Sequence, residues 1–254
     1  RLDYRFNSSH NVYGRYLALV LVVVTTALLY VRDRRPFWLL AGTILVLWIG
    51  LAQTFSQSSF IALLGGLAVL AALRWSWRWT LAAVGVGVIG AVLVVMLAGG
   101  KGFDLDRLNL ETSGRSNLVS GGAELFSERP LWGYGSGSFQ QAYRERRSEK
   151  KAPVTISHTE PITVAAEQGA IGLAAYAALL VVAIWTLAAG IWARESGRDP
   201  TVLDAARAAV LATFVALLVH TLAYAGFIED PITWVLLAVG ASLAAQRAGA
   251  VRDP

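Results

Sequence analysis

The residues best suited to chemistry lie in a polar segment, from about Gly100 to Glu160, that interrupts an otherwise apolar chain. His158 stands near its end, just before an apolar stretch that opens with Pro161, a residue suited to the first turn of a helix. An imidazole at such a boundary can accept a proton from a sugar hydroxyl near neutral pH. A single histidine in a loop is more often structural, so a catalytic His158 is a hypothesis at this point.

Arg115 is the second candidate. It follows Ser113, a residue type that often caps helices, and we predict a short helix from Arg115 to about Phe126, on the membrane surface or under a lid. In the first turn of such a helix, a guanidinium and exposed backbone N–H groups can hold an anion together. A snorkelling or salt-bridged arginine is the commoner explanation of such a position, and anion binding by Arg115 is the alternative hypothesis.

Two further segments of this region are polar. The stretch Trp132–Phe139 alternates glycine with other residues but lacks the Gly-Lys-Ser/Thr of a Walker loop. It predicts a compact turn, with a phosphate-binding nest of amides as the alternative. The run Arg144–Lys151 holds five cations and two anions. Such a run is typical of a solvated helix face, or else it attracts an anionic lipid head group.

The sequence predicts no metal site. His158 and Glu160 are spaced too closely for a helical zinc motif, and His10 and His220 lie in other segments. Glu167 and His220 fall inside apolar stretches, where an ionisable residue indicates a functional or paired role. For His220, a packing role with a hydrogen bond to another helix is as good an explanation as a role in the site.

Composition identifies a membrane protein. Hydrophobic residues make up 56% of the 254-residue chain, against roughly 45–50% in ordinary soluble domains. There is no cysteine, which excludes disulfides and thiolate metal sites. The net charge of +5 is explained by topology signals and anionic lipid, so we predict no nucleic-acid partner. We expect one membrane domain over residues 1–254, and, because the chain begins at Arg1 without a signal peptide, we expect spans upstream of it.

The expected fold is an all-α, polytopic bundle of about seven transmembrane helices with one long extracytoplasmic loop, residues 100–160, that contains short helices. About 20 apolar residues are needed to cross the hydrocarbon core as a helix. The predicted spans are Tyr13–Val31, Phe37–Gln53, Ser58–Leu73, Thr80–Gly99, Pro161–Trp192, Leu203–Ala225 and Pro231–Ala245.

The distribution of Lys and Arg predicts the orientation of these spans. The short loops Thr54–Gln57 and Gly226–Asp230 contain neither residue, whereas every other short loop is basic. The positive-inside rule places the basic loops in the cytoplasm and residues 100–160 outside. The basic loops carry Arg32, Arg34, Arg35, Arg74, Arg78, Arg194, Arg198, Arg247 and Arg252.

In combination and order, four segments resemble the C-terminal half of the O-antigen ligase and polymerase family. The resemblance covers about Arg1 to Gln246 and is strongest between Gly114 and Leu173. The segments are Ser113-Gly114-Arg115, Arg129-Pro130-Leu131-Trp132-Gly133-Tyr134-Gly135-Ser136-Gly137-Ser138-Phe139, Ser157-His158-Thr159-Glu160 and Ala166-Glu167-Gln168-Gly169-Ala170-Ile171-Gly172-Leu173.

The resemblance implies a multispanning glycosyltransferase of polysaccharide biosynthesis on the outer face of the bacterial cytoplasmic membrane. It implies transfer of a glycan from an undecaprenyl-diphosphate carrier to a saccharide, lipid or protein acceptor, without a metal or another cofactor. Arg115 would hold the departing diphosphate and His158 would activate the acceptor hydroxyl. Substrate-binding roles are assigned to Arg129, Arg144, Arg146, Arg147, Glu160 and Glu167.

The chain departs from the family pattern at one place. Family members often carry an arginine in an S-R motif at the start of the span that matches Ser58–Leu73, and the segment Phe55–Phe60 has none. We expect either that Arg15 or Arg107 supplies the charge on the donor side instead, or that activity is reduced or absent.

Other functions remain open from the sequence. A ligase and a polymerase share these motifs, so the sequence does not separate them. A transporter or flippase of polyprenyl-linked saccharide would show broken helices in paired positions, an internal repeat and ionisable groups at the membrane midplane. A non-catalytic scaffold of a cell-envelope complex would tolerate substitution of both Arg115 and His158.

Overall fold

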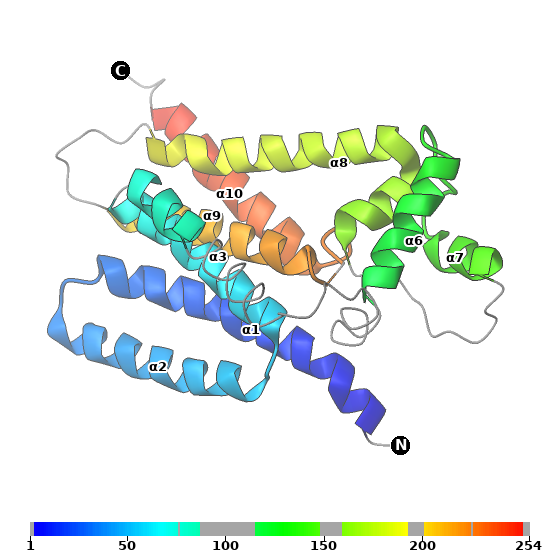
Figure 1. Ribbon diagram of the computed structural model, residues 1–254. Coiled ribbons are helices and arrows are strands. Elements are labelled where there is room, and N and C mark those ends of the chain that lie inside the picture. Colours follow the sequence, from blue (N-terminus) through cyan, green and yellow to red (C-terminus); the bar gives the residue numbers. More distant parts are fainter. Residues whose placement is uncertain are drawn as a thin grey trace. The chain divides into compact units, whose positions relative to one another are not determined.

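A computed structural model of the chain describes residues 3–75, 77–86, 115–147, 159–192, 201–224 and 226–250. Within these ranges all regular secondary structure is helical, which confirms the predicted all-α class. The helices with assigned bounds, labelled in Figure 1, are α1 (Asp3–Tyr30), α2 (Arg34–Gln53), α3 (Gln57–Arg74), α6 (Arg115–Glu128), α7 (Phe139–Arg147), α8 (Glu160–Trp192), α9 (Val202–Thr221) and α10 (Pro231–Ala250).

The chain divides into two compact units. The first comprises Arg1–Ala82, Val182–His220 and Phe227–Pro254, and it holds α1, α2, α3, α10, nearly all of α9 and the C-terminal part of α8. The second comprises Ala83–Val181 and Thr221–Gly226. It holds α6, α7 and the N-terminal part of α8.

The predicted spans correspond to long apolar helices. Among the described residues, five helical segments are long and apolar enough to cross a membrane, and α10 adds the shorter apolar stretch Pro231–Gln246. The predicted span Thr80–Gly99 is described only as far as residue 86, and residues 77–86 are helical. The five segments are His10–Tyr30, Arg34–Gln53, Gln57–Arg74, Glu160–Ala189 and Val202–Thr221.

In the first unit, α1 packs against both α2 and α3 (Figure 1). The core consists of leucine, valine and alanine side chains from α1, α2, α3 and α9, among them Val22, Leu63 and Ala216. Gly66 on α3 brings these helices close together, because a Cβ at Gly66 would lie 3.1 Å from both the carbonyl oxygen of Ala212 and the Cβ of Ala216. Small residues at such crossings are typical of helices packed within a membrane.

The outward faces of the helices are as apolar as the core. On α2 only Leu51 is buried, while Trp38 is 71% exposed and Leu39 is 73% exposed. An apolar surface of this extent would drive association in water, but hydrocarbon covers it without cost. The pattern therefore fits a multi-pass membrane protein whose outer surface faces lipid.

Candidate functional site

The helix α8 is broken at Gly169. The backbone there has φ 65° and ψ −163°, a conformation outside the helical region that is essentially restricted to glycine. The break separates a short helical piece, which begins at Glu160, from the long apolar remainder. It also removes the intrahelical hydrogen bonds of the residues on both sides, so those backbone groups need other partners.

The glycine-rich segment 130–135 supplies these partners. The amide of Ala170 donates to the carbonyl oxygen of Pro130 (2.7 Å), and the amide of Gly135 donates to the carbonyl oxygen of Glu167 (2.7 Å). The amide of Tyr134 likewise donates to Ala166 (3.1 Å). Amides of the loop thus pair with carbonyl oxygens before the break, and carbonyl oxygens of the loop pair with amides after it. This loop exchange fixes the loop to the helix.

Close approach of the two backbones requires glycine on both sides. A Cβ at Gly169 would overlap the backbone of Leu131 and Trp132, and a Cβ at Gly133 would overlap the backbone of Glu167 and Gln168. Gly133, Gly135 and Gly137 all have positive φ. The predicted compact turn at Trp132–Phe139 is confirmed: Gly133 allows its close approach to α8, and Gly135 and Gly137 allow its backbone conformation.

Glu167 fixes the end of the same loop. Its buried carboxylate accepts hydrogen bonds from the backbone amides of Gly137 (2.8 Å) and Phe139 (3.0 Å). Phe139 is the first residue of α7, so the carboxylate satisfies N–H groups that the helix itself leaves unpaired and complements its dipole. The predicted paired role of an ionisable residue in this apolar helix is therefore fulfilled by capping of α7.

The helices α6 and α7 pack through a small apolar core. Leu125, Phe139 and Tyr143 are buried together. The hydroxyl of Tyr143 donates to the carbonyl oxygen of Asn117 (3.4 Å), which lies in the first turn of α6. The basic helix α7 therefore lies against the turn of α6 that begins with Arg115.

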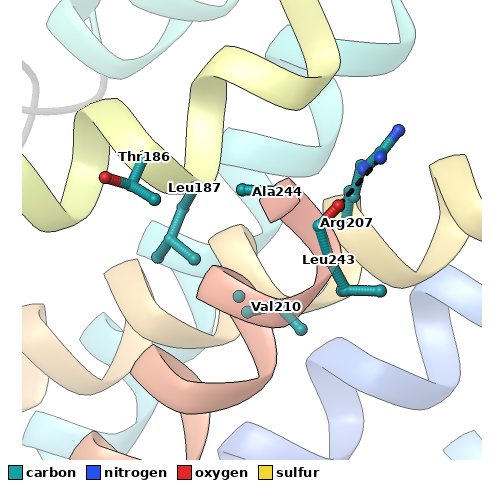
Figure 2. A pocket seen from close by; sticks show the side chains of 7 residues that line it. Thr186, Leu187, Arg207, Val210, Leu243 and Ala244 are labelled. Carbon is teal, nitrogen blue, oxygen red and sulfur yellow. Dashed lines mark hydrogen bonds between the residues drawn. The ribbon is translucent and has the colours of Figure 1, made fainter. Parts of the chain in front are cut away.

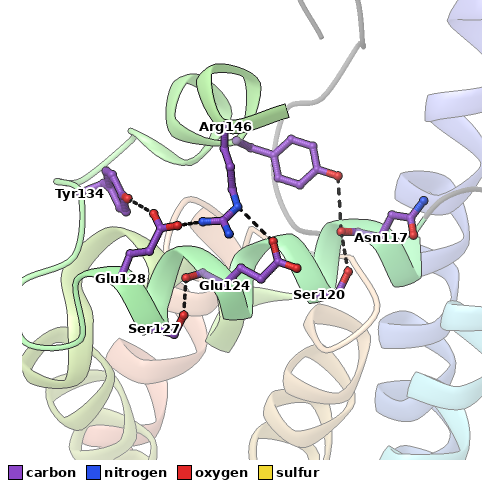
Figure 3. Close-up of polar contacts among 8 residues, drawn as sticks. Asn117, Ser120, Glu124, Ser127, Glu128, Tyr134 and Arg146 are labelled. Carbon is purple, nitrogen blue, oxygen red and sulfur yellow. Dashed lines mark hydrogen bonds and ion pairs between the residues drawn. The ribbon is translucent and has the colours of Figure 1, made fainter. Parts of the chain in front are cut away.

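A polar network continues this contact on the surface (Figure 3). Arg146 of α7 forms ion pairs with Glu124 (3.1 Å) and Glu128 of α6. The hydroxyl of Tyr134 donates to Glu128, and the guanidinium of Arg129 lies 4.5 Å from the centre of the Tyr134 ring. The predicted binding residues Arg129 and Arg146 thus belong to one network, in which two carboxylates balance the charge of Arg146.

The remaining predicted residues are placed less completely. Arg115 is the first residue of α6, and the predicted short helix is confirmed with an end two residues later than expected. Arg144 and Arg147 both lie on α7, and Arg144 is half-buried. His158, together with Ser113, lies outside the described residues.

Glu160 begins α8 and is buried. Its carboxylate accepts a hydrogen bond from the backbone amide of Gly226 (2.6 Å), which follows α9. Glu160 and Glu167 therefore bind different partners. Glu167 holds the loop before α7, whereas Glu160 holds the turn after α9.

The first unit contains a buried polar cluster around the start of α3, where the S-R motif would stand. Ser56 donates to the side-chain oxygen of Asn11 (2.8 Å), and the hydroxyl of Ser58 lies 3.3 Å from Nε2 of His220. His220 is fully buried and so has the predicted hydrogen bond to a neighbouring helix. The polar side chains at the start of α3 thus pair with one another and with residues of α1 and α9.

Arg15, one expected substitute for that arginine, is also buried. Its Nη1 lies 2.8 Å from Oδ2 of Asp230, and both side chains are almost fully covered. The charge of Arg15 is therefore balanced inside the bundle. The other expected substitute, Arg107, lies outside the described residues.

A small cavity lies between α8, α9 and α10 in the first unit (Figure 2). Its volume of about 10 Å³ leaves room for about one water molecule. The guanidinium of Arg207, at its edge, donates to the carbonyl oxygen of Leu243 (2.9 Å). A cavity of this size cannot hold a sugar. Among the described residues, no group of three or more His, Asp and Glu side chains is arranged to hold a metal ion.

Sequence reasoning missed the break in α8 and the loop docked on it. The signal that could have revealed it is Gln168-Gly169 directly after Glu167, at the edge of a long uncharged stretch. A glycine beside a polar pair at that edge is compatible with a helix end, although periodicity alone predicts continuous helix.

Comparison with known proteins identifies a family for this chain. No curated protein matches the chain. The family model described as O-antigen ligase matches residues 42–177, more than half of the chain. The match includes α6, α7, the docked loop and the break in α8. The chain therefore belongs to the O-antigen ligase family.

Proposed function

We propose that this protein transfers a glycan from undecaprenyl diphosphate to an acceptor on the outer face of the bacterial cytoplasmic membrane. Family membership indicates an enzyme of the O-antigen ligase or polymerase type. The absence of Lys and Arg from the loops 54–57 and 226–230 supports an outer position for α6 and α7, which lie in the long loop on that side. Both compact units then form one membrane domain.

The observation that carries the proposal is the position of α7 beside the first turn of α6. Tyr143 contacts Asn117 there, so α7 lies beside the helix turn that begins with Arg115. Two family segments, 129–139 and 166–173, hold this arrangement through the loop exchange and Glu167. A guanidinium at a helix start is suited to a diphosphate, because the unpaired backbone N–H groups there also bind anions.

In the proposed reaction, the bond between the anomeric carbon of the donor sugar and a diphosphate oxygen breaks. The acceptor oxygen forms the new bond to that carbon, and its proton passes to His158. Arg115 stabilises the negative charge that develops on the leaving undecaprenyl diphosphate. A guanidinium is suited to this role because it stays charged and binds two oxygens at once.

Arg129 is proposed to act elsewhere on the donor. It follows the last residue of α6, whereas Arg115 is the first, so the two backbones are about 20 Å apart along the helix. A diphosphate cannot bridge that distance. We therefore assign Arg129, with Arg144 and Arg147, to capture of the donor, and Arg146 chiefly to the packing of α7 on α6.

A transporter is the second candidate because α8 is broken, as spans of transporters often are. In transporters the freed backbone groups bind substrate near the midplane. In α8 they bind the loop 130–135 instead, and the break lies close to one end of the helix. This difference favours the enzyme.

The proposal is tested with purified protein in proteoliposomes, supplied with an undecaprenyl-diphosphate-linked oligosaccharide and a membrane extract that provides acceptors. Arg115→Ala and His158→Ala are each expected to lower the rate of glycan transfer about a hundredfold or more. The matched controls are Arg34→Ala and His10→Ala, since both residues are exposed and lie outside residues 100–160 in the sequence. Full activity of both loop variants at equal protein levels would overturn the proposal.

A further inference from the structure

The uncharged part of α8 begins at its break. Glu167 is the last charged residue before Gly169, and no Asp, Glu, Lys or Arg follows until Arg194. From Ala170 to Trp192 the helix rises about 34 Å at 1.5 Å per residue, which covers a hydrocarbon core of about 30 Å. The turn that follows Gly169 therefore lies where this helix enters the lipid.

The loop docked on the break is fixed at this same level. The amides of Ala170 and Ile171 donate to the carbonyl oxygens of Pro130 (2.7 Å) and Leu131 (3.5 Å). These bonds tie the backbone of Leu131 directly to the first turn of the uncharged helix. Whatever depth that turn has in the membrane, Leu131 and its neighbour share it.

Leu131 and Trp132 are both strongly exposed, at 61% and 74%. Ile171, on the adjoining turn of α8, is 50% exposed. The backbone bond between Ile171 and Leu131 places these exposed apolar residues next to one another, and Val181 further along α8 is also 66% exposed. The same loop also has a polar exposed residue, Ser136.

We propose that Leu131 and Trp132 anchor the loop in the lipid interface. Tryptophan is favoured at this level of a bilayer because its ring is apolar and its N–H can meet water or head groups. The anchor holds α6 and α7 at a fixed height above the membrane, through the docked loop and Glu167. The inference depends on the membrane position of α8 and not on the proposed reaction.

Because the chain contains no cysteine, single cysteines can be introduced without other changes. Trp132→Cys and Leu131→Cys are each spin-labelled in phospholipid nanodiscs, and Ser136→Cys on the same loop is the matched control. Electron paramagnetic resonance then measures access of oxygen, which concentrates in lipid, and of a nickel chelate, which stays in water. Both apolar positions are expected to favour oxygen, and position 136 is expected to favour nickel.

Equal access of nickel at positions 131, 132 and 136 would overturn the anchor. Shielding of position 132 that arises only when saccharide is added would also overturn it, because the surface would then be a platform for sugar. Leu131→Cys keeps the tryptophan in place, so it decides the question if Trp132→Cys does not fold. Size-exclusion chromatography and circular dichroism establish that each labelled protein is folded.

Discussion

The carboxylate of Glu167, inside the apolar helix α8, lies 3.0 Å from the backbone amide of Phe139, the first residue of α7. A second amide, that of Gly137, lies 2.8 Å from the same carboxylate. A buried charge in such a helix is tolerated because these hydrogen bonds stabilise it. The bonds also join two segments that are separated in sequence, and so they determine where α7 lies.

Substitution of Glu167 tests this joint. Glu167→Ala removes the acceptor for both amides, and each hydrogen bond to a charged group contributes about 1.5–3 kcal/mol. We expect a clear fall in the free energy of unfolding and loss of transfer, with Glu167→Gln between wild type and alanine. Thermal unfolding in detergent measures the effect, and Glu145→Gln on the exposed face of α7 is the control. Unchanged stability of Glu167→Ala would show that the joint is not needed.

A second prediction concerns Gly169. Alanine is strained at its backbone angles by about 1–3 kcal/mol, and its Cβ would also overlap the backbone of Leu131. We expect Gly169→Ala to release the loop, which limited proteolysis should detect as new cleavage within residues 129–138. Gly42→Ala is the control, because a Cβ at Gly42 meets no atom within 4 Å. Resistance to proteolysis equal to the control would contradict the docking.

The fold was largely predictable from the sequence, because a span leaves a local signal. A run of about twenty apolar residues and a serine before Arg115 are both signals within a short stretch of sequence. The structure has helices in those places. The loop exchange at Gly169 joins residues more than thirty positions apart by backbone bonds, which no side-chain pattern records. The same holds for the contact between Tyr143 and Asn117, and therefore for the position of α7.

The candidate site was predictable only in part. Arginine and glutamate positions were found as chemically capable residues, but their partners decide their use. Arg146 is paired with Glu124 and Glu128, and Arg15 with Asp230, and neither pairing follows from spacing along the chain. The roles of Arg115 and His158 stay predictions.

The pair formed by Arg15 and Asp230 gives a third prediction. Asp230→Ala leaves a buried guanidinium uncompensated, which costs about 3–5 kcal/mol. Asp230 also accepts a hydrogen bond from the amide of Ile232 (2.9 Å), so Asp230→Asn separates the loss of charge from the loss of this cap.

The double variant Arg15→Met with Asp230→Asn is compared with the two single variants. Its free energy of unfolding is expected to fall by less than the sum of the falls in Arg15→Met and Asp230→Asn. Chemical denaturation in detergent gives all three values. Additive losses would mean that the two charges do not stabilise each other. Loss of transfer in a stable Arg15→Met would instead assign Arg15 to the donor site.

Arg129 gives a fourth prediction, based on its distance from Arg115. Arg129→Ala is expected to raise the KM for the donor and to leave kcat nearly unchanged, because a group remote from the leaving diphosphate contributes to binding rather than to the transition state. Arg146→Ala is the comparison and should change stability by about 1 kcal/mol or less, since its ion pairs are partly exposed. Steady-state rates measured at varied donor concentration give KM and kcat for Arg129→Ala and so show which of the two changes. An equal fall in kcat and kcat/KM for Arg129→Ala would place it at the reacting centre.

The most direct test of glycan transfer by this protein is the stoichiometry of the reaction in proteoliposomes that contain EDTA. Mass spectrometry would count free undecaprenyl diphosphate and new glycosidic bonds from the same sample. We predict one diphosphate lipid released for each bond formed, with both products lost in Arg115→Ala. Donor that crosses the bilayer with its sugar-phosphate bond intact, and no release of undecaprenyl diphosphate, would contradict the account.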